Sequence, residues 1–187
     1  MPNRALSLKD ETFEQQATRT MLPAFNEEIA RKLGEIVVNI ASRRGLPIAV
    51  SVVHPRSALF YCALEGSCAD NAQWIRRKEN TVFHFGRSSL EVGVMFGHEG
   101  WSLSSHGLSG QDYTLFGGGV PLRVANAGIV GAMSVSGLDH VKDHELVIEA
   151  LCWHLGIPHV DSVLSCPHPV RMHDREQVHV EHEEPGS

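Results

Sequence analysis

The sequence has 187 residues, 42% of them hydrophobic, and a formal net charge of −6 at pH 7. This length suits one domain with a real core, and the negative charge argues against a nucleic-acid-binding protein that neutralises many phosphates. No apolar run reaches the roughly 18 residues of a membrane span, and the polar N-terminus lacks the apolar region of a secretory signal. The four cysteines form no CxxC pair, so we expect a reducing, cytoplasmic compartment.

The first half of the chain predicts a helix and a β-hairpin. Residues 1–21 are interpreted as an N-terminal extension, which contains a short helix near 12–21. Asn26 predicts the start of the next helix and Gly45 its end, because apolar residues recur between them at helical spacing. Residues 47–64 are typical of a hairpin, since two apolar extended segments flank a His-Pro-Arg-Ser turn.

The second half predicts further helices and strands, and then a tail. The expected elements are a helix from Asp70 or Asn71 to about Phe85, a short helix opened by the capping box Ser88–Glu91, strands near 120–124 and 129–136, a helix from His140 to Leu155 and a short edge strand at Val160–Leu164. A single domain is thus expected over 22–165. Residues 166–187 are acidic and rich in histidine, which favours a flexible tail.

This order of elements predicts an α+β fold. The strands come in hairpins, so we expect an antiparallel sheet with helices mainly on one face.

A glycine run, Phe116-Gly117-Gly118-Gly119-Val120-Pro121, precedes the third strand. It lacks the G-x-G-x-x-G spacing of a dinucleotide-binding turn, and it leads into a strand instead of a helix. Two interpretations stay open. Gly118, Gly119 and Pro121 bring backbone close to a ligand or a neighbouring subunit, or the run is a tightly bent strand start.

Lys78 falls on the apolar face of its helix, together with Trp74, and Arg77 lies one step round the helix. A ligand with carboxylates or phosphates would suit Arg77 and Lys78, with Trp74 stacked on it. In the alternative interpretation, which is the commoner behaviour of such a lysine, Lys78 pairs with a carboxylate of the chain itself.

His140 and His144 are four residues apart at a helix start. This spacing places both on one face, as a metal or haem pair requires, although two solvated histidines would give the same pattern. No Walker loop, G-x-S-x-G or HExxH motif is present, so the sequence leaves enzyme activity undecided.

Several short motifs occur in a characteristic order. They are Asn71-x-x-Trp74-Ile75-x-Arg77-Lys78-x-Asn80-Thr81-Val82, Ser88-Ser89, Gly117-Gly118-Gly119-x-Pro121, Val135-Ser136-Gly137-Leu138 and Asp143-His144-Glu145. With them, residues 22–158 resemble the haem-degrading-domain superfamily of HbpS-like and GlcG-like proteins. Within it, the chain is similar to a branch of cytosolic bacterial and fungal proteins of uncharacterised function.

The resemblance implies an antiparallel sheet of about five strands with flanking helices, of profilin- or PAS-like shape, and a homo-oligomer. It also implies haem or iron as a candidate cofactor, because some members bind them. Our first hypothesis is therefore an oligomeric binding protein for haem or an anionic metabolite, with His144 as the first candidate for an axial ligand. Its site would lie between the helix 74–85 and the glycine run.

Two other hypotheses remain. One is a structural or partner-binding oligomer without catalytic activity. The other is a metal-dependent enzyme on an anionic metabolite, with the metal held by His140 and His144. None of the three involves a membrane or a nucleic acid.

Overall fold

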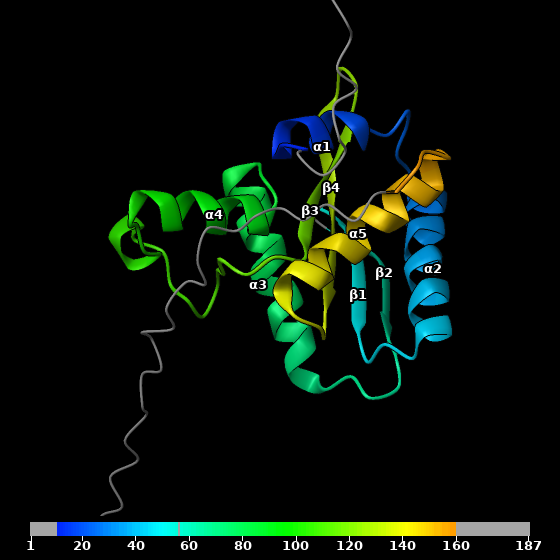
Figure 1. Ribbon diagram of the computed structural model, residues 1–187, viewed down its shortest axis with the longest axis horizontal. Coiled ribbons are helices and arrows are strands. Elements are labelled where there is room, and N and C mark those ends of the chain that lie inside the picture. The colour runs from blue at the N-terminus through cyan, green and yellow to red at the C-terminus, as the bar shows by residue number, and fades with distance from the viewer. Residues whose placement is uncertain (1–10, 56, 160–187) are drawn as a thin grey trace, which may run out of the picture.

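The computed structural model describes residues 11–55 and 57–159 of the chain. Its elements are, in order, α1 (Phe13–Arg19), α2 (Glu27–Arg44), β1 (Ala49–His54), β2 (Ser57–Ala63), α3 (Ala69–Phe85), α4 (Ser89–Glu99), the 3-10 turn η2 (Ser104–His106), β3 (Gly119–Val124), β4 (Gly128–Ser136) and α5 (His140–Leu155) (Figure 1). The predicted strand at Val160–Leu164 and the predicted tail at 166–187 lie outside the described residues. No described helix has the length and apolar character needed to cross a membrane.

The strands form one antiparallel sheet in the order β2-β1-β4-β3. In the register of this sheet, Val52 of β1 lies opposite Phe60 of β2 and Met133 of β4. The α+β class and the antiparallel sheet are confirmed. The expected count of about five strands is corrected to four within the described part of the chain.

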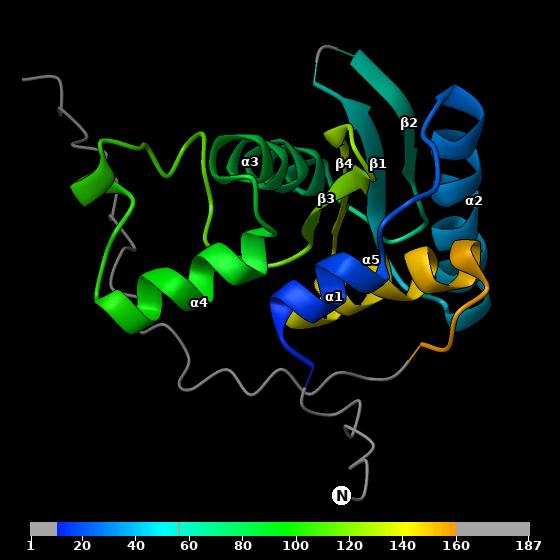
Figure 2. The same ribbon diagram turned by 90° about the horizontal axis from the view of Figure 1, so that it is seen from above.

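Helices cover both faces of the sheet, which corrects the expectation of cover mainly on one face (Figure 2). The helices α2 and α5 pack together over the core that contains Val50 and Val52. The opposite face carries α3, whose Val82 packs with Val53 and Ala132. The physical reason is that β1 is buried on both sides from Ala49 to Val53, so each face needs a covering layer.

The ends of α2 and α3 show how local signals set the elements. The Asn26 side chain accepts a hydrogen bond from Ile29 N at 2.9 Å, and Gly45 ends α2 in the left-handed conformation at φ 62°, as predicted. The helix α3 begins earlier than predicted, with Cys68 as its N-cap. Asn71 instead sits in the first turn and accepts from Cys68 N at 2.7 Å.

The short helix α1 packs against the rest of the domain near β3 and α5 (Figure 2). Thr12 and Gln15 cap it reciprocally, and Leu22 N then donates to Arg123 O of β3 at 2.8 Å. The segment that was predicted to be an extension therefore packs on the domain as α1. The domain limits at 21 and 165 stay predictions.

The contact between α2 and β2 gives a testable prediction. A Cβ added to Gly34 would stand 2.2 Å from the ring of Phe60, whereas a Cβ on Gly97 of α4 would meet nothing within 4 Å. We expect Gly34→Ala to lower the free energy of unfolding by about 1–3 kcal/mol, because the ring must move. The control Gly97→Ala should raise it by up to about 1 kcal/mol through helix propensity. Urea unfolding measures both, and equal losses would contradict this packing.

Candidate functional site

A buried ion pair between Lys78 of α3 and Asp143 of α5 lies where the two helical layers meet the end of the sheet. Lys78 Nζ donates to Asp143 Oδ2 at 2.8 Å and to the carbonyl oxygen of Val135 at 2.8 Å. The other carboxylate oxygen accepts from Leu138 N at 3.0 Å, and each side chain is only 3% exposed. The pair thus ties α3, the end of β4 and the first turn of α5 together.

Burial and attraction act in opposite directions on this pair. Burial lowers the pKa of Lys78 and raises the pKa of Asp143, while the attraction between the two groups opposes both shifts. The charged forms are further stabilised by the hydrogen bond that Lys78 donates to Val135 O and by the one that Asp143 accepts from Leu138 N. An isolated buried pair would lack both.

The glycine run packs directly on this ion pair. Gly118 has φ +116°, and a Cβ on it would stand 2.6 Å from Lys78 Nζ and 2.7 Å from Asp143 Cβ. A Cβ on Gly119 would stand 2.9 Å from Lys78 Cβ. The close approach is therefore to side chains of the chain itself. The ion pair fills the space beside Gly118 and Gly119. Direct contact of a ligand with Lys78, Gly118 and Gly119 stays a prediction.

Trp74 and Arg77 do come together, beside Phe116 at the start of the glycine run. The Arg77 guanidinium lies 4.7 Å from the centre of the Trp74 ring, and that ring meets Phe116 at 5.5 Å. Phe116 in turn meets the His140 ring at 5.4 Å, and His140 Nδ1 accepts from Gly117 N at 3.3 Å. The result is a row of partly buried rings that joins α3 to α5.

His144 lies apart from that row and is fully buried. Its Nε2–H donates to Gln16 Oε1 of α1 at 2.8 Å, and its ring meets Phe13 edge-on at 6.3 Å. Its Nδ1 has no hydrogen-bond partner among the described residues. Burial, with the nearby charges of His140 and Lys78, lowers the pKa of His144 to about 3, so the imidazole is neutral at physiological pH.

The predicted pairing of His140 and His144 on a metal ion stays a prediction. The two rings have different partners, Gly117 for His140 and Gln16 for His144. Within residues 11–55 and 57–159, no group of three or more histidine, cysteine, aspartate or glutamate side chains is placed to hold a metal ion.

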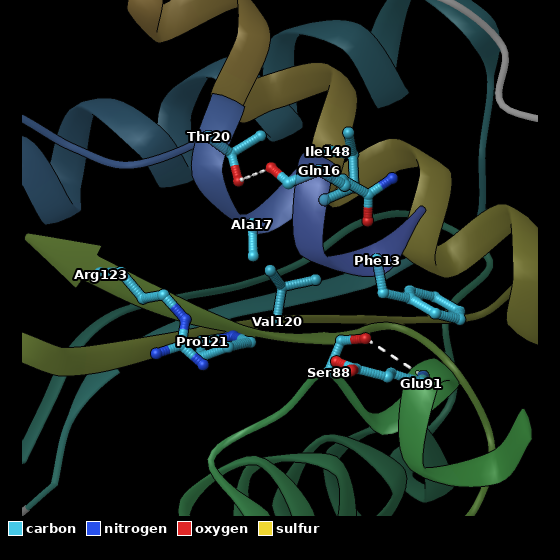
Figure 3. Close-up of a pocket in the computed structure, with 10 residues that line it drawn as sticks. All are labelled: Phe13, Gln16, Ala17, Thr20, Ser88, Glu91, Val120, Pro121, Arg123 and Ile148. Atoms are coloured by element: carbon cyan, nitrogen blue, oxygen red, sulfur yellow. Dashed lines mark hydrogen bonds between the residues drawn. The ribbon is translucent and has the colours of Figure 1, made fainter. Parts of the chain in front are cut away.

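A cleft opens between α1, the start of α4, β3 and α5 (Figure 3). It is small and partly open to solvent, with an enclosed volume of about 20 Å³. The residues that line it are Phe13, Gln16, Ala17, Thr20, Ser88, Glu91, Val120, Pro121, Arg123 and Ile148. Of the residues that the sequence singled out for ligand binding, only Pro121 lies here.

Two residues connect the cleft with His144. Phe13 and Gln16 line the cleft, and both also contact His144. Sequence reasoning missed these two residues because they lie in the segment taken for an extension. The Thr12–Gln15 capping box was the one local signal that this segment forms a defined helix.

A family model for haem-degrading, HbpS-like proteins matches residues 25–152. The chain is 46% identical over 146 residues to UPF0303 protein ZMO1353 of Zymomonas mobilis, which covers 78% of each chain. It is also 43% identical over 137 residues to a UPF0303 protein of Paraburkholderia phytofirmans, which covers 73% of this chain and 83% of the relative. The chain therefore belongs to the HbpS-like haem-degrading-domain family, as its motifs predicted.

Solved structures agree with this fold. The Ybr137w protein is similar at a TM-score of 0.72 and 25% identity, over 82% of this chain and 90% of that one. HbpS itself matches at a TM-score of 0.57 and 19% identity, over 73% and 93% of the two chains. The PduOC:heme complex matches at 0.57 and 18%, over 74% and 98%. At these last two identities the likeness concerns the fold alone.

The buried ion pair predicts strongly non-additive mutants. Lys78→Met or Asp143→Asn alone should cost about 3–5 kcal/mol of unfolding free energy, because each leaves a buried polar partner unpaired. The double variant should cost clearly less than the sum of the two. Lys32→Met, which removes an exposed pair with Glu28, is the control and should cost at most about 1 kcal/mol. Urea unfolding measures all four variants, and additive losses from Lys78 and Asp143 would contradict the pairing.

His144 predicts a loss of stability in acid. Its folded-state pKa of about 3 lies below the unfolded value of about 6.5, so its contribution is complete above the unfolded value and is lost as pH falls toward 3. From about pH 7 to about pH 5, the wild type should lose about 2 kcal/mol more than His144→Met. Urea unfolding at the two pH values measures the difference, and parallel losses would show that His144 can be protonated in the folded protein.

Proposed function

We propose that this protein is a cytoplasmic, homo-oligomeric binding protein for haem or another small anionic molecule, and that the ligand enters the cleft beside α1. The observation that carries the proposal is the state of His144. This neutral imidazole has one ring nitrogen without a partner, and two of the side chains that contact it also line the cleft. Membership of the HbpS-like family supports haem as the first ligand to test.

The chemistry of these residues fits haem, but the cleft in this conformation is too small to hold it. Bound haem would supply an iron that accepts a histidine nitrogen as an axial ligand. His144 offers a neutral imidazole whose Nε2–H donates to Gln16, which leaves the lone pair on Nδ1 as the one that could bind iron. The cleft also offers only about 20 Å³ of enclosed space, little more than one water molecule needs, so a molecule the size of haem does not fit it in this conformation. Binding would thus require α1 to move.

A second placement uses the residues that the sequence singled out. There Trp74 would stack on the ligand and Arg77 would hold its carboxylate, beside Gly118, Gly119 and His140. His140 is less suited to bind a metal, because its Nδ1 accepts from Gly117 N and its neutral form then carries the proton on Nε2. Lys78 would join this site only if its bond to Asp143 opened.

The edge strand β2 supports the proposed homo-oligomer. Its sequence, Ser-Ala-Leu-Phe-Tyr-Cys-Ala, has no charge and no proline, and Tyr61 on it is 51% exposed. Soluble proteins usually protect such an edge. The other edge strand, β3, carries Pro121 and Arg123 and is joined by Leu22. This contrast also favours the alternative function, an assembly that binds partners and performs no chemistry.

A haemin titration of the full-length protein, followed by Soret absorbance, tests the first placement. We expect a saturable shift near one haem per chain, and His144→Ala should weaken binding by at least about tenfold because the axial ligand is lost. A matched background removes four further histidines of the sequence, which could bind haemin nonspecifically, by changing His168, His173, His179 and His182 to alanine.

The same titration separates the alternatives. Arg77→Glu should weaken haemin binding only if the ligand lies on Trp74; it is preferred to a double variant with Lys78, since loss of the buried pair would itself destabilise the fold. Unchanged affinity in His144→Ala would reject His144 as the ligand. Failure to saturate, together with an oligomer in sedimentation, would favour the assembly function.

A further inference from the structure

Two residues that line the cleft, Gln16 and Arg123, each carry a buried N–H donor without a partner in the described part of the chain. Gln16 is 4% exposed. Its Oε1 accepts from His144, and its Nε2 has no hydrogen-bond partner within residues 11–55 and 57–159. Arg123 donates from Nη2 to the carbonyl oxygen of Gly86, but its Nε is buried and has no partner among the residues that the structure describes. A buried donor without a partner is destabilising, so a ligand that accepts from these groups would recover stabilisation that the protein alone does not have.

Arg123 also lacks a counterion among the described residues. No carboxylate of residues 11–55 and 57–159 lies within ion-pair distance of it. Glu91, the carboxylate that lines the same cleft, pairs with Arg87 instead. A partly buried guanidinium without a counterion, with a free N–H, is suited to bind a carboxylate.

The rest of the cleft limits what else the ligand can be. Val120, Pro121 and Ile148 present apolar surface, and in Figure 3 Val120 lies between Arg123 on one side and Gln16 on the other. Glu91 would repel an anion, and more strongly a dianion such as a phosphate monoester than a singly charged carboxylate. Both features favour an apolar molecule that bears a carboxylate.

We infer that Arg123 binds a carboxylate of the ligand and that Gln16 donates to a second acceptor oxygen, with the apolar part of the ligand on Val120, Pro121 and Ile148. The inference rests on the proposed function for the location of the site. It adds the chemical group that is recognised and a residue, Arg123, that recognises it.

Esterification of the ligand tests this recognition directly. Haemin and haemin dimethyl ester are titrated into the full-length wild type and into Arg123→Met, with Soret absorbance as the readout. We expect the wild type to prefer haemin by about tenfold, and Arg123→Met to lose this preference by weakening haemin alone, because the charged contact is gone. Arg123→Lys should keep part of it, and Arg31→Met, a surface arginine of α2 that is 54% exposed, should leave it unchanged.

A ligand without iron separates failure of this inference from failure of haem binding. Parinaric acid, an apolar fluorescent monocarboxylate, is titrated alongside its methyl ester. If haemin fails to bind but the wild type prefers the acid to the ester, and Arg123→Met does not, the carboxylate site stands without haem. Equal affinity for acid and ester in both ligand pairs, or no binding of either acid, would overturn the inference; if haemin still binds, the proposed function survives. Thermal melts of each variant confirm that it is folded.

Discussion

The ion pair between Lys78 and Asp143 is the constraint on which the arrangement of this domain depends. A buried charge pair is tolerated only when its remaining hydrogen-bonding groups are also satisfied, and here Val135 O and Leu138 N satisfy them. The pair joins one helical layer to the other around the end of the sheet. The backbone that packs on the pair must therefore carry no side chain that points at it. The glycines follow from this requirement, since a Cβ on Gly118 would come within 2.6 Å of Lys78 Nζ.

The ion pair also fixes the first turn of α5 and with it the two histidines. His140 and His144 share a helix face by spacing, yet their rings contact different segments of the chain. His140 meets the glycine run, and His144 meets α1. Burial, with positive groups nearby, keeps His144 neutral, which is the form in which an imidazole can bind a metal.

Local signals in the sequence predicted most elements and one anomaly of the site. Asn26, Gly45, Gly86 and Gly156 stand at helix ends as expected, because capping depends on residues within one turn. A charged Lys78 on an apolar face was also visible. Its partner Asp143 is 65 residues away, and no local pattern selects it from the other acidic residues. Arg123 gave no signal either, because what distinguishes it is the absence of a counterion within the described part of the chain, which only the packed structure displays.

The short helix α1 decides how tightly any ligand of the cleft can bind. Seven residues do not form a stable helix in isolation, so α1 is held by its contacts: Arg19 to Glu11 and Cys152, and Gln16 to His144. If a ligand requires α1 to open, its apparent affinity falls by the fraction of molecules that are open, about tenfold for each 1.4 kcal/mol of opening cost. The unpartnered N–H groups of Gln16 and Arg123 offset this cost, because they gain hydrogen bonds only when the ligand is bound. In the proposed site, α1 and the unpartnered donors would therefore act together. A molecule without a hydrogen-bond acceptor could not offset the free energy needed to move α1, whereas a carboxylate could.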